Sequence, residues 1–131
     1  KFWRNNKGPA VADYTLQKSL IFAAQNLAPS DFTAYKAQYD EFYKTYKQPD
    51  LVVYLHTHLE VLQKQIRKRG RPYEQQIQTT YLKKIEAAYE SLFHLKLPFK
   101  VVPIAVENLD FETDQQAYHS ILRRLFKVSF L

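Results

Sequence analysis

The chain has 131 residues, of which 46% are hydrophobic and 15% aromatic, and its formal net charge is +6. This length suits a single domain, and the hydrophobic share supports a core, which argues against global disorder. The lack of cysteine excludes disulfides, thiolate metal sites and cysteine catalysis, and it suits a cytoplasmic protein. No apolar run approaches the roughly 18 residues of a membrane span, so we expect no membrane partner. The positive charge favours an anionic partner.

The N-terminal third predicts one strand and two helices. Residues 10–12 form a short apolar strand that delivers Asp13 at its C-terminal end, where carboxylates of α/β sheets face the ligand. Thr15 is placed to cap the next helix, and Ser30 to cap the one after it. The second helix carries an aromatic stripe at helical spacing, which favours packing: Phe32, Tyr35, Tyr39, Phe42, Tyr43 and Tyr46.

The central stretch predicts a strand, a helix and a cationic turn. Residues 51–55 read as a buried strand, and Thr57 with Glu60 forms a capping box that starts a helix. That helix runs into residues 67–71, which place four cations in five positions around Gly70. Such a turn cannot be core, so we expect it to meet an anion.

The C-terminal part predicts a long helix, a strand and a last helix. The helix starts at Thr79 or Thr80 and ends near residue 95, and its inner face is Tyr81, Leu82, Ile85, Ala88, Tyr89 and Leu92. Residues 101–106 form a strand, which Pro103 confines to an edge. The last helix, about 114–126, turns four residues inward: Tyr118, Ile121, Leu122 and Leu125. Strands that alternate with helices indicate an α/β fold with a parallel sheet in one domain.

Several known catalytic motifs are absent from the sequence. The four histidines have no metal-ligand spacing, no G-x-S-x-G is present, and two glycines cannot make a phosphate-binding loop. The arginine cluster remains. Arg69 and Arg71 flank Gly70 and can close together over a ligand, as phosphoryl transfer requires. Glu74 suits a sugar hydroxyl better than a nucleic-acid backbone.

Three stretches of the chain resemble the deoxynucleoside kinase family, in particular its bacterial deoxyadenosine/deoxyguanosine kinase branch. They are PDLVVYL, QIRKRGRPYEQQI and YLKKIEAAYESLF, supported by VADYTLQKSLIFA and ENLDF. The resemblance implies a P-loop kinase-like three-layer α/β fold with a parallel sheet. It covers about residues 9–126 and makes residues 67–76 the family's arginine-rich LID.

The resemblance also implies roles for individual residues. Arg69 and Arg71 would grip the phosphates of ATP, Glu74 would hold the 3′-hydroxyl, and Phe22 would stack on the base. The adenine of ATP would lie against Asn108, Asp110 and Phe111. Asp13 would lie near the 5′-hydroxyl and Mg²⁺, although Tyr14 replaces the arginine that normally follows. Lys18 stands near the place of a base-recognising aspartate, which leaves the preferred base open.

The family's phosphate-binding loop and catalytic glutamate have no counterpart in this sequence. The chain also lacks methionine and begins at Lys1. We therefore expect only the C-terminal strands and helices of a longer kinase, as one partial domain over residues 1–131, which would be inactive alone.

The sequence is compatible with three functions. The first is ATP- and Mg²⁺-dependent phosphorylation of a deoxynucleoside, with a purine and nucleotide salvage expected, by a homodimer. The alternative is a non-catalytic interaction module derived from such a kinase. Nucleic-acid binding ranks last, because no aromatic residues interleave with residues 67–71.

Overall fold

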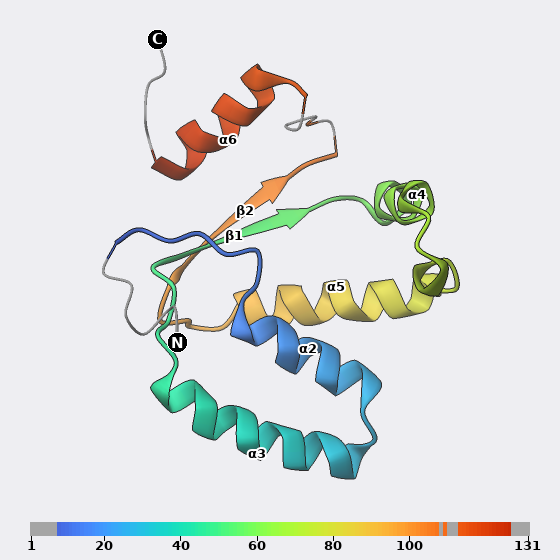
Figure 1. Cartoon of the computed structure of the whole chain (residues 1–131), viewed down its shortest axis with the longest axis vertical. Coiled ribbons are helices and arrows are strands. Elements are labelled where there is room, and N and C mark those ends of the chain that lie inside the picture. The colour runs from blue at the N-terminus through green and yellow to red at the C-terminus, as the bar shows by residue number, and fades with distance from the viewer. Residues whose placement is uncertain (1–7, 108, 110–112, 127–131) are drawn as a thin grey trace. The chain divides into compact units, whose positions relative to one another are not determined.

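The computed structural model describes residues 8–107, 109 and 113–126. Figure 1 shows the helices and strands in chain order. They are α2 (Leu16–Asn26), α3 (Pro29–Thr45), β1 (Leu51–His56), α4 (Leu59–Arg69), the 3₁₀ helix η1 (Pro72–Glu74), α5 (Thr79–Phe93), β2 (Lys100–Ala105) and α6 (Gln115–Phe126). The chain divides into a helical unit, Lys1–Pro49 with Thr80–Lys96, and a sheet unit, Asp50–Thr79 with Leu97–Leu131.

The two apolar runs of the sheet unit form a parallel pair of strands. Val52 of β1 lies opposite Val101 of β2, and the register continues to His56 opposite Ala105. One further backbone bond, from the Val106 amide to the His56 carbonyl at 2.9 Å, extends the ladder beyond the strands. The prediction of an α/β fold with a parallel sheet is confirmed. Within the described residues β2 pairs with β1 alone, so Pro103 does lie on an edge strand, as its missing amide hydrogen requires.

The prediction of a buried strand at residues 51–55 is confirmed for the strand but wrong for its burial. Val52 is buried, whereas Val53 and Leu55 are 37% and 47% exposed. Successive side chains of a strand point to opposite faces, so a run of apolar residues is buried fully only where both faces are covered. Ile104 of β2 is the most buried large side chain described, and Phe99, Ala117 and Ile121 are also buried in this unit.

Helices α2 and α3 contact each other and run in roughly opposite directions (Figure 1). Among the described residues of the helical unit, the buried hydrophobic side chains are Ile21, Tyr39 and Ile85. The Asn26 amide donates to the Tyr81 hydroxyl across 2.9 Å and joins α2 to α5. The inner face predicted for α5 is confirmed, because all six of its residues are buried or half-buried and the residues between them are exposed.

The strand predicted at residues 10–12 is absent from the structure. These residues have no regular secondary structure, and Val11 is 99% exposed. No described strand pairs with them, and an extended segment without a partner cannot satisfy its backbone groups in a ladder. The apolar composition of residues 10–12 alone is therefore not enough to form a strand.

Two predicted helix caps are also wrong. Helix α4 takes His58 as its N-cap in place of Thr57, and the Thr57 hydroxyl is buried without a hydrogen-bond partner among the described residues. Helix α3 begins at Pro29 with Ala28 as N-cap, so Ser30 lies inside the first turn. Proline is favoured at the first helical position, because its fixed φ already suits the helix and its missing amide is not needed there.

The inner face predicted for the last helix, α6, is confirmed at three of its four residues and wrong at Tyr118. Tyr118 is 47% exposed and contradicts the prediction, whereas the small Ala117 beside it is buried. Ile121 is buried, and Leu122 and Leu125 are half-buried, as expected. A tyrosine keeps its hydroxyl in water at no cost at this position, while Ala117 allows close packing.

Candidate functional site

The cationic turn is built by a sharp stop at the end of α4. We call residues 67–76 the arginine segment. Gly70 ends the helix in the left-handed conformation, with φ of 70°, and its amide donates to the carbonyls of Ile66 and Arg67. An added Cβ would meet only the Lys68 carbonyl oxygen, at 4.0 Å, so the backbone angle and not the available space calls for glycine. The chain turns back here and brings Arg71 close to Arg69.

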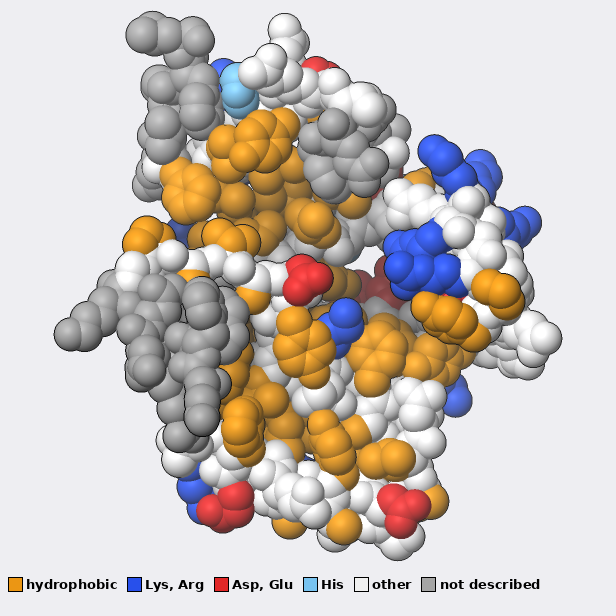
Figure 2. Space-filling model, in the orientation of Figure 1, with side chains coloured by type: hydrophobic (Ala, Val, Ile, Leu, Met, Phe, Trp, Pro, Cys, Tyr) orange, Lys and Arg blue, Asp and Glu red, His pale blue; other side chains and the backbone are white. Residues whose placement is uncertain are grey.

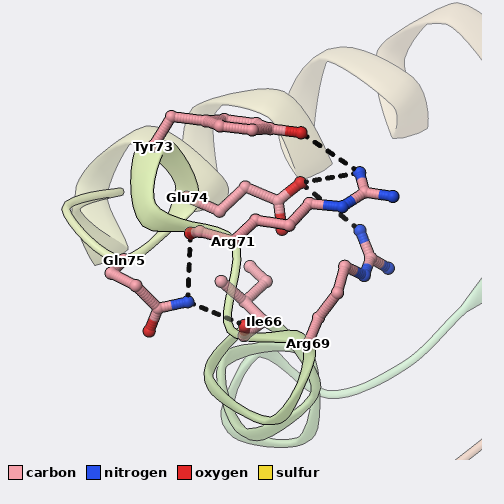
Figure 3. A network of polar contacts seen from close by, with 6 residues as sticks. All are labelled: Ile66, Arg69, Arg71, Tyr73, Glu74 and Gln75. Atoms are coloured by element: carbon pink, nitrogen blue, oxygen red, sulfur yellow. Dashed lines mark hydrogen bonds and ion pairs between the residues drawn. The ribbon is translucent and has the colours of Figure 1, made fainter.

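Glu74 holds both arginines through a single oxygen, as Figure 3 shows. Oε1 of Glu74 lies 3.2 Å from a terminal nitrogen of Arg71 and 3.5 Å from one of Arg69. The Glu74 side chain is 13% exposed, while those of Arg69 and Arg71 are about half exposed, at 53% and 54%. The carboxylate therefore lies beneath two guanidinium groups that face solvent. Figure 2 shows Lys and Arg side chains gathered on the surface in the region of α4 and η1.

Tyr73 and Gln75 complete the segment. Arg71 also donates to the Tyr73 hydroxyl at 3.3 Å. The Gln75 amide donates to the Ile66 carbonyl at 3.1 Å and to the Arg71 carbonyl at 3.3 Å (Figure 3). Gln75 thus ties the end of α4 to the turn that follows it. Neither residue was singled out from the sequence, since both depend on how the turn folds back and no periodic pattern marks them.

The local charges keep Arg71 cationic. Tyr73, followed by Glu74, raises the pKa of Arg71 above its ordinary value. Each arginine has five N–H donors in a planar fork, and Glu74 engages only one terminal nitrogen of each. The second Glu74 oxygen, Oε2, is buried without a hydrogen-bond partner among the described residues. The segment thus offers spare donors for an anion and one buried acceptor for a hydroxyl.

A second group of side chains lies along α2 in the helical unit. The ammonium of Lys18 is 5.8 Å from the centre of the Tyr14 ring and 6.0 Å from that of Phe22. Phe22 lies four residues after Lys18 on the same face of α2, whereas Tyr14 precedes the helix, so Lys18 contacts one ring from the helix and one from the segment before it. Asp13 lies at an exposed bend before α2, so the structure does not place it at the end of a strand.

Comparison with known proteins decides the family. Residues 1–129 match the family model described as Deoxynucleoside kinase. The chain belongs to the deoxynucleoside kinase family. The resemblance seen in the sequence is therefore confirmed, and the described helices and parallel strands are consistent with part of a P-loop kinase-like α/β fold.

Two deoxynucleoside kinase relatives are similar over much of the chain. A protein named deoxyguanosine kinase from Bacillus subtilis is 37% identical over 82 residues, covering 63% of this chain and 40% of the relative. A protein named deoxyadenosine kinase from Lactobacillus acidophilus is 26% identical over 131 residues, covering 88% of this chain and 60% of the relative. The chain thus spans less than two thirds of the length of either relative.

The deoxynucleoside kinase residues expected from the sequence fall into three places. Arg69, Arg71 and Glu74 come together in the sheet unit. Lys18 and Phe22 come together in the helical unit, which also contains Asp13. Asn108, Asp110 and Phe111, expected beside the adenine, lie outside the described residues.

Within residues 8–107, 109 and 113–126, no group of three or more histidine, aspartate or glutamate side chains is arranged to hold a metal ion. No helix in the same part of the chain is long and apolar enough to cross a membrane.

Proposed function

We propose that this chain is part of an enzyme that transfers the terminal phosphoryl group of ATP to the 5′-hydroxyl of a purine deoxynucleoside. A bond forms between the 5′-oxygen and the γ-phosphorus, and the bond from that phosphorus to the bridging oxygen of ADP breaks. The hydroxyl proton is released, and the products are ADP and a deoxynucleoside 5′-monophosphate. The paired arginines on Glu74 are the observation that carries this proposal.

The arginine pair suits a phosphate group that gains charge during transfer. The transition state of phosphoryl transfer spreads negative charge over the equatorial oxygens, which preorganised guanidinium groups stabilise. Arg69 and Arg71 are already drawn together by Glu74, and their exposed N–H groups are available to an anion. Because they are held before the substrate arrives, less ordering remains to be done during the reaction.

Glu74 can also position the sugar. Its Oε2 is a buried acceptor that lacks a donor among the described residues, and such atoms are uncommon in folded proteins. A hydroxyl of deoxyribose would supply the missing donor. The same side chain would then link the sugar to the two arginines, which would align the nucleoside with the phosphate to be transferred.

The remaining parts of the proposal rest on the family. Mg²⁺ would enter with ATP as its complex and neutralise phosphate charge, and Asp13 would lie near it and the 5′-hydroxyl. Asn108, Asp110 and Phe111 would line the adenine of ATP. A purine base is supported by the names of both relatives. We extend the proposal to a role in nucleotide salvage, a cytoplasmic location and a homodimer.

Turnover by the full-length protein tests the proposal. ADP release would be measured with ATP, Mg²⁺ and each of the four deoxynucleosides in turn, and we expect turnover with at least one purine deoxynucleoside. Arg71→Ala should abolish most of it, whereas Arg67→Ala should not, because the Arg67 side chain has no bond within the described part of the chain. Absence of turnover with all four would overturn the proposal, and absence of a thermal shift with ATP and Mg²⁺ would favour the interaction module instead.

A further inference from the structure

One exposed tyrosine of the arginine segment contacts an arginine on which the proposed reaction depends. Tyr73 is 73% exposed, and its hydroxyl lies 3.3 Å from Nη1 of Arg71 (Figure 3). Arginine has N–H donors and no acceptor, so the tyrosine oxygen accepts this hydrogen bond. The proposed function uses Arg71 but gives Tyr73 no role.

This contact contributes little to the stability of the fold. Tyr73 and Arg71 are two residues apart in one exposed turn, so their bond joins no distant elements. A hydrogen bond at such a position replaces one made with water, and its net contribution is small. By contrast, the Tyr81 hydroxyl accepts from Asn26 and joins α5 to α2. The contact of Tyr73 is therefore better explained by its effect on Arg71.

One nitrogen of Arg71 serves two acceptors. Nη1 donates to Oε1 of Glu74 across 3.2 Å and to the Tyr73 hydroxyl across 3.3 Å. A terminal guanidinium nitrogen carries two hydrogens, so these two bonds use both of them. A single acceptor would leave the guanidinium free to turn about that bond. Two acceptors in different places fix its plane.

The two bonds leave one edge of the Arg71 guanidinium to a ligand. Nε and Nη2 carry the other three hydrogens, and neither nitrogen bonds a described residue. Two of these hydrogens are parallel, which lets the edge bind two oxygens of one phosphate. The Arg71 side chain is about half exposed, so an anion can approach it. The fixed plane thus offers a two-point phosphate site in place of a mobile charge.

We propose that Tyr73 is a positioning residue for phosphoryl transfer, which holds the Nε/Nη2 edge of Arg71 toward the phosphate by accepting from Nη1. Donors that are already in place stabilise the transition state best, because they need no rearrangement as charge develops. The hydroxyl keeps its own proton and takes no part in the transfer. This inference rests on the proposed function, since it gives Tyr73 a role in that reaction.

Tyr73→Phe tests the proposal, because it removes the hydroxyl and keeps the exposed ring. The full-length protein would be assayed with ATP, Mg²⁺ and the deoxynucleoside that gives the highest turnover. We expect kcat to fall about tenfold through misorientation of Arg71. The KM for the deoxynucleoside should stay within about twofold, because Glu74 is unchanged. The midpoint of thermal unfolding should match the wild type.

Unchanged kcat in Tyr73→Phe, beside a wild type that turns over, would overturn the inference. No turnover by the wild type with any deoxynucleoside would instead overturn the proposed function. Tyr118→Phe is the matched control. Tyr118 is a 47% exposed tyrosine of α6 whose hydroxyl makes no hydrogen bond with a described residue, so this variant should keep the wild-type kcat.

The Arg71→Lys background shows whether Tyr73 acts through the arginine. Lysine has no guanidinium edge to orient, so adding Tyr73→Phe to Arg71→Lys should lower kcat by less than about twofold. A tenfold loss in both backgrounds would show that Tyr73 acts independently of Arg71 and would contradict the inference.

Replacement of Tyr73 by O-methyltyrosine separates the two hydrogen-bonding roles of the hydroxyl. The analogue keeps the oxygen that accepts from Arg71 but has no O–H to donate, and the exposed position leaves room for its methyl group. We expect kcat within about threefold of the wild type, because the bond from Nη1 is retained. A loss as large as that of Tyr73→Phe would show that the hydroxyl acts as a donor, and the positioning role would be wrong.

Discussion

Arg71 donates to Oε1 of Glu74 across 3.2 Å, and the same oxygen lies 3.5 Å from Arg69 on the other side of Gly70. One carboxylate thus sets the separation of two cations that belong to different elements, one at the end of α4 and one in the turn after it. The relationship makes Glu74 a positioning residue for the arginines as well as the candidate acceptor for the sugar.

Replacement of Glu74 should therefore affect binding of the sugar and alignment of the arginines together. Glu74→Gln keeps the shape of the side chain but removes its charge. We expect kcat/KM for the deoxynucleoside to fall roughly tenfold to a hundredfold, the worth of hydrogen bonds to a charged group. Steady-state kinetics of the full-length protein would show this. Glu86→Gln, at an exposed position of α5 without a side-chain bond to a described residue, should match the wild type. Equal losses in both variants would contradict the assignment.

Gly70 should be intolerant of side chains for a conformational reason. Alanine is less stable than glycine in the left-handed conformation that Gly70 adopts, with φ of 70°. Gly70→Ala should therefore lower the free energy of unfolding by about 1 kcal/mol. Gly70→Asn should lose less, because asparagine visits this region more readily. Urea unfolding would compare the two. Because the site has room for a Cβ, a much larger loss than about 2 kcal/mol in the alanine variant would show that the cause is steric.

Gln75 and Gln76 form a natural matched pair. Gln75 bonds the carbonyls of Ile66 and Arg71, whereas Gln76 is exposed and makes no bond with a described residue. Gln75→Ala should cost about 1 kcal/mol of stability and raise the KM for ATP, because the turn that carries Arg71 loses its tie to α4. Gln76→Ala should change neither quantity. Thermal unfolding and ATP kinetics on both variants test this, and indistinguishable variants would refute a role for the tie.

Much of the fold could be predicted because its signals are local and periodic. The apolar runs at β1 and β2 indicated strands, and the spacing of Tyr81, Ile85 and Leu92 gave the inner face of α5. The predictions failed where the outcome depends on a partner. Residues 10–12 have the composition of a strand without a described strand to pair with, and the exposure of Val53 depends on what covers each face of the sheet.

In the candidate site too, the local features could be predicted from the sequence and the contacts between side chains could not. The sequence R-G-R-P-Y-E places two cations and one carboxylate within a short turn, and in the structure Arg69, Arg71 and Glu74 lie together. The sequence did not reveal that one oxygen of Glu74 contacts both arginines or that Gln75 fixes the turn. These contacts follow from the left-handed backbone angle at Gly70 and from side-chain rotamers. The position of Lys18 between two rings likewise depends on α2 starting at Leu16.

Alkaline pH should destabilise the helical unit through Tyr39. Burial, followed by the nearby Tyr43 and Asp40, raises the pKa of Tyr39 from 10.0 to about 12. Above pH 10 the unfolded chain loses this proton while the folded chain keeps it, so the stability that Tyr39 contributes is present below pH 10 and is lost as pH rises toward 12. The slope would approach about 1 kcal/mol per pH unit. Urea unfolding between pH 9 and 12 should show a shallower decline for Tyr39→Phe; equal slopes would contradict the shift.

The two arginines should act as one unit in catalysis. Lysine keeps the charge but loses the planar fork that grips a phosphate, so Arg69→Lys and Arg71→Lys should each lower kcat by roughly 10²–10³. Arg67 lies in the last turn of α4 and has no side-chain bond to a described residue, so Arg67→Lys should keep most of the activity.

Because both arginines share one oxygen of Glu74, loss of either disturbs the other. The double variant should therefore lose less than the product of the single losses, as expected for residues in one network. Strictly multiplicative losses in kcat would show that the arginines act independently, and a rise in the nucleoside KM with unchanged kcat would place them outside the transferring phosphate.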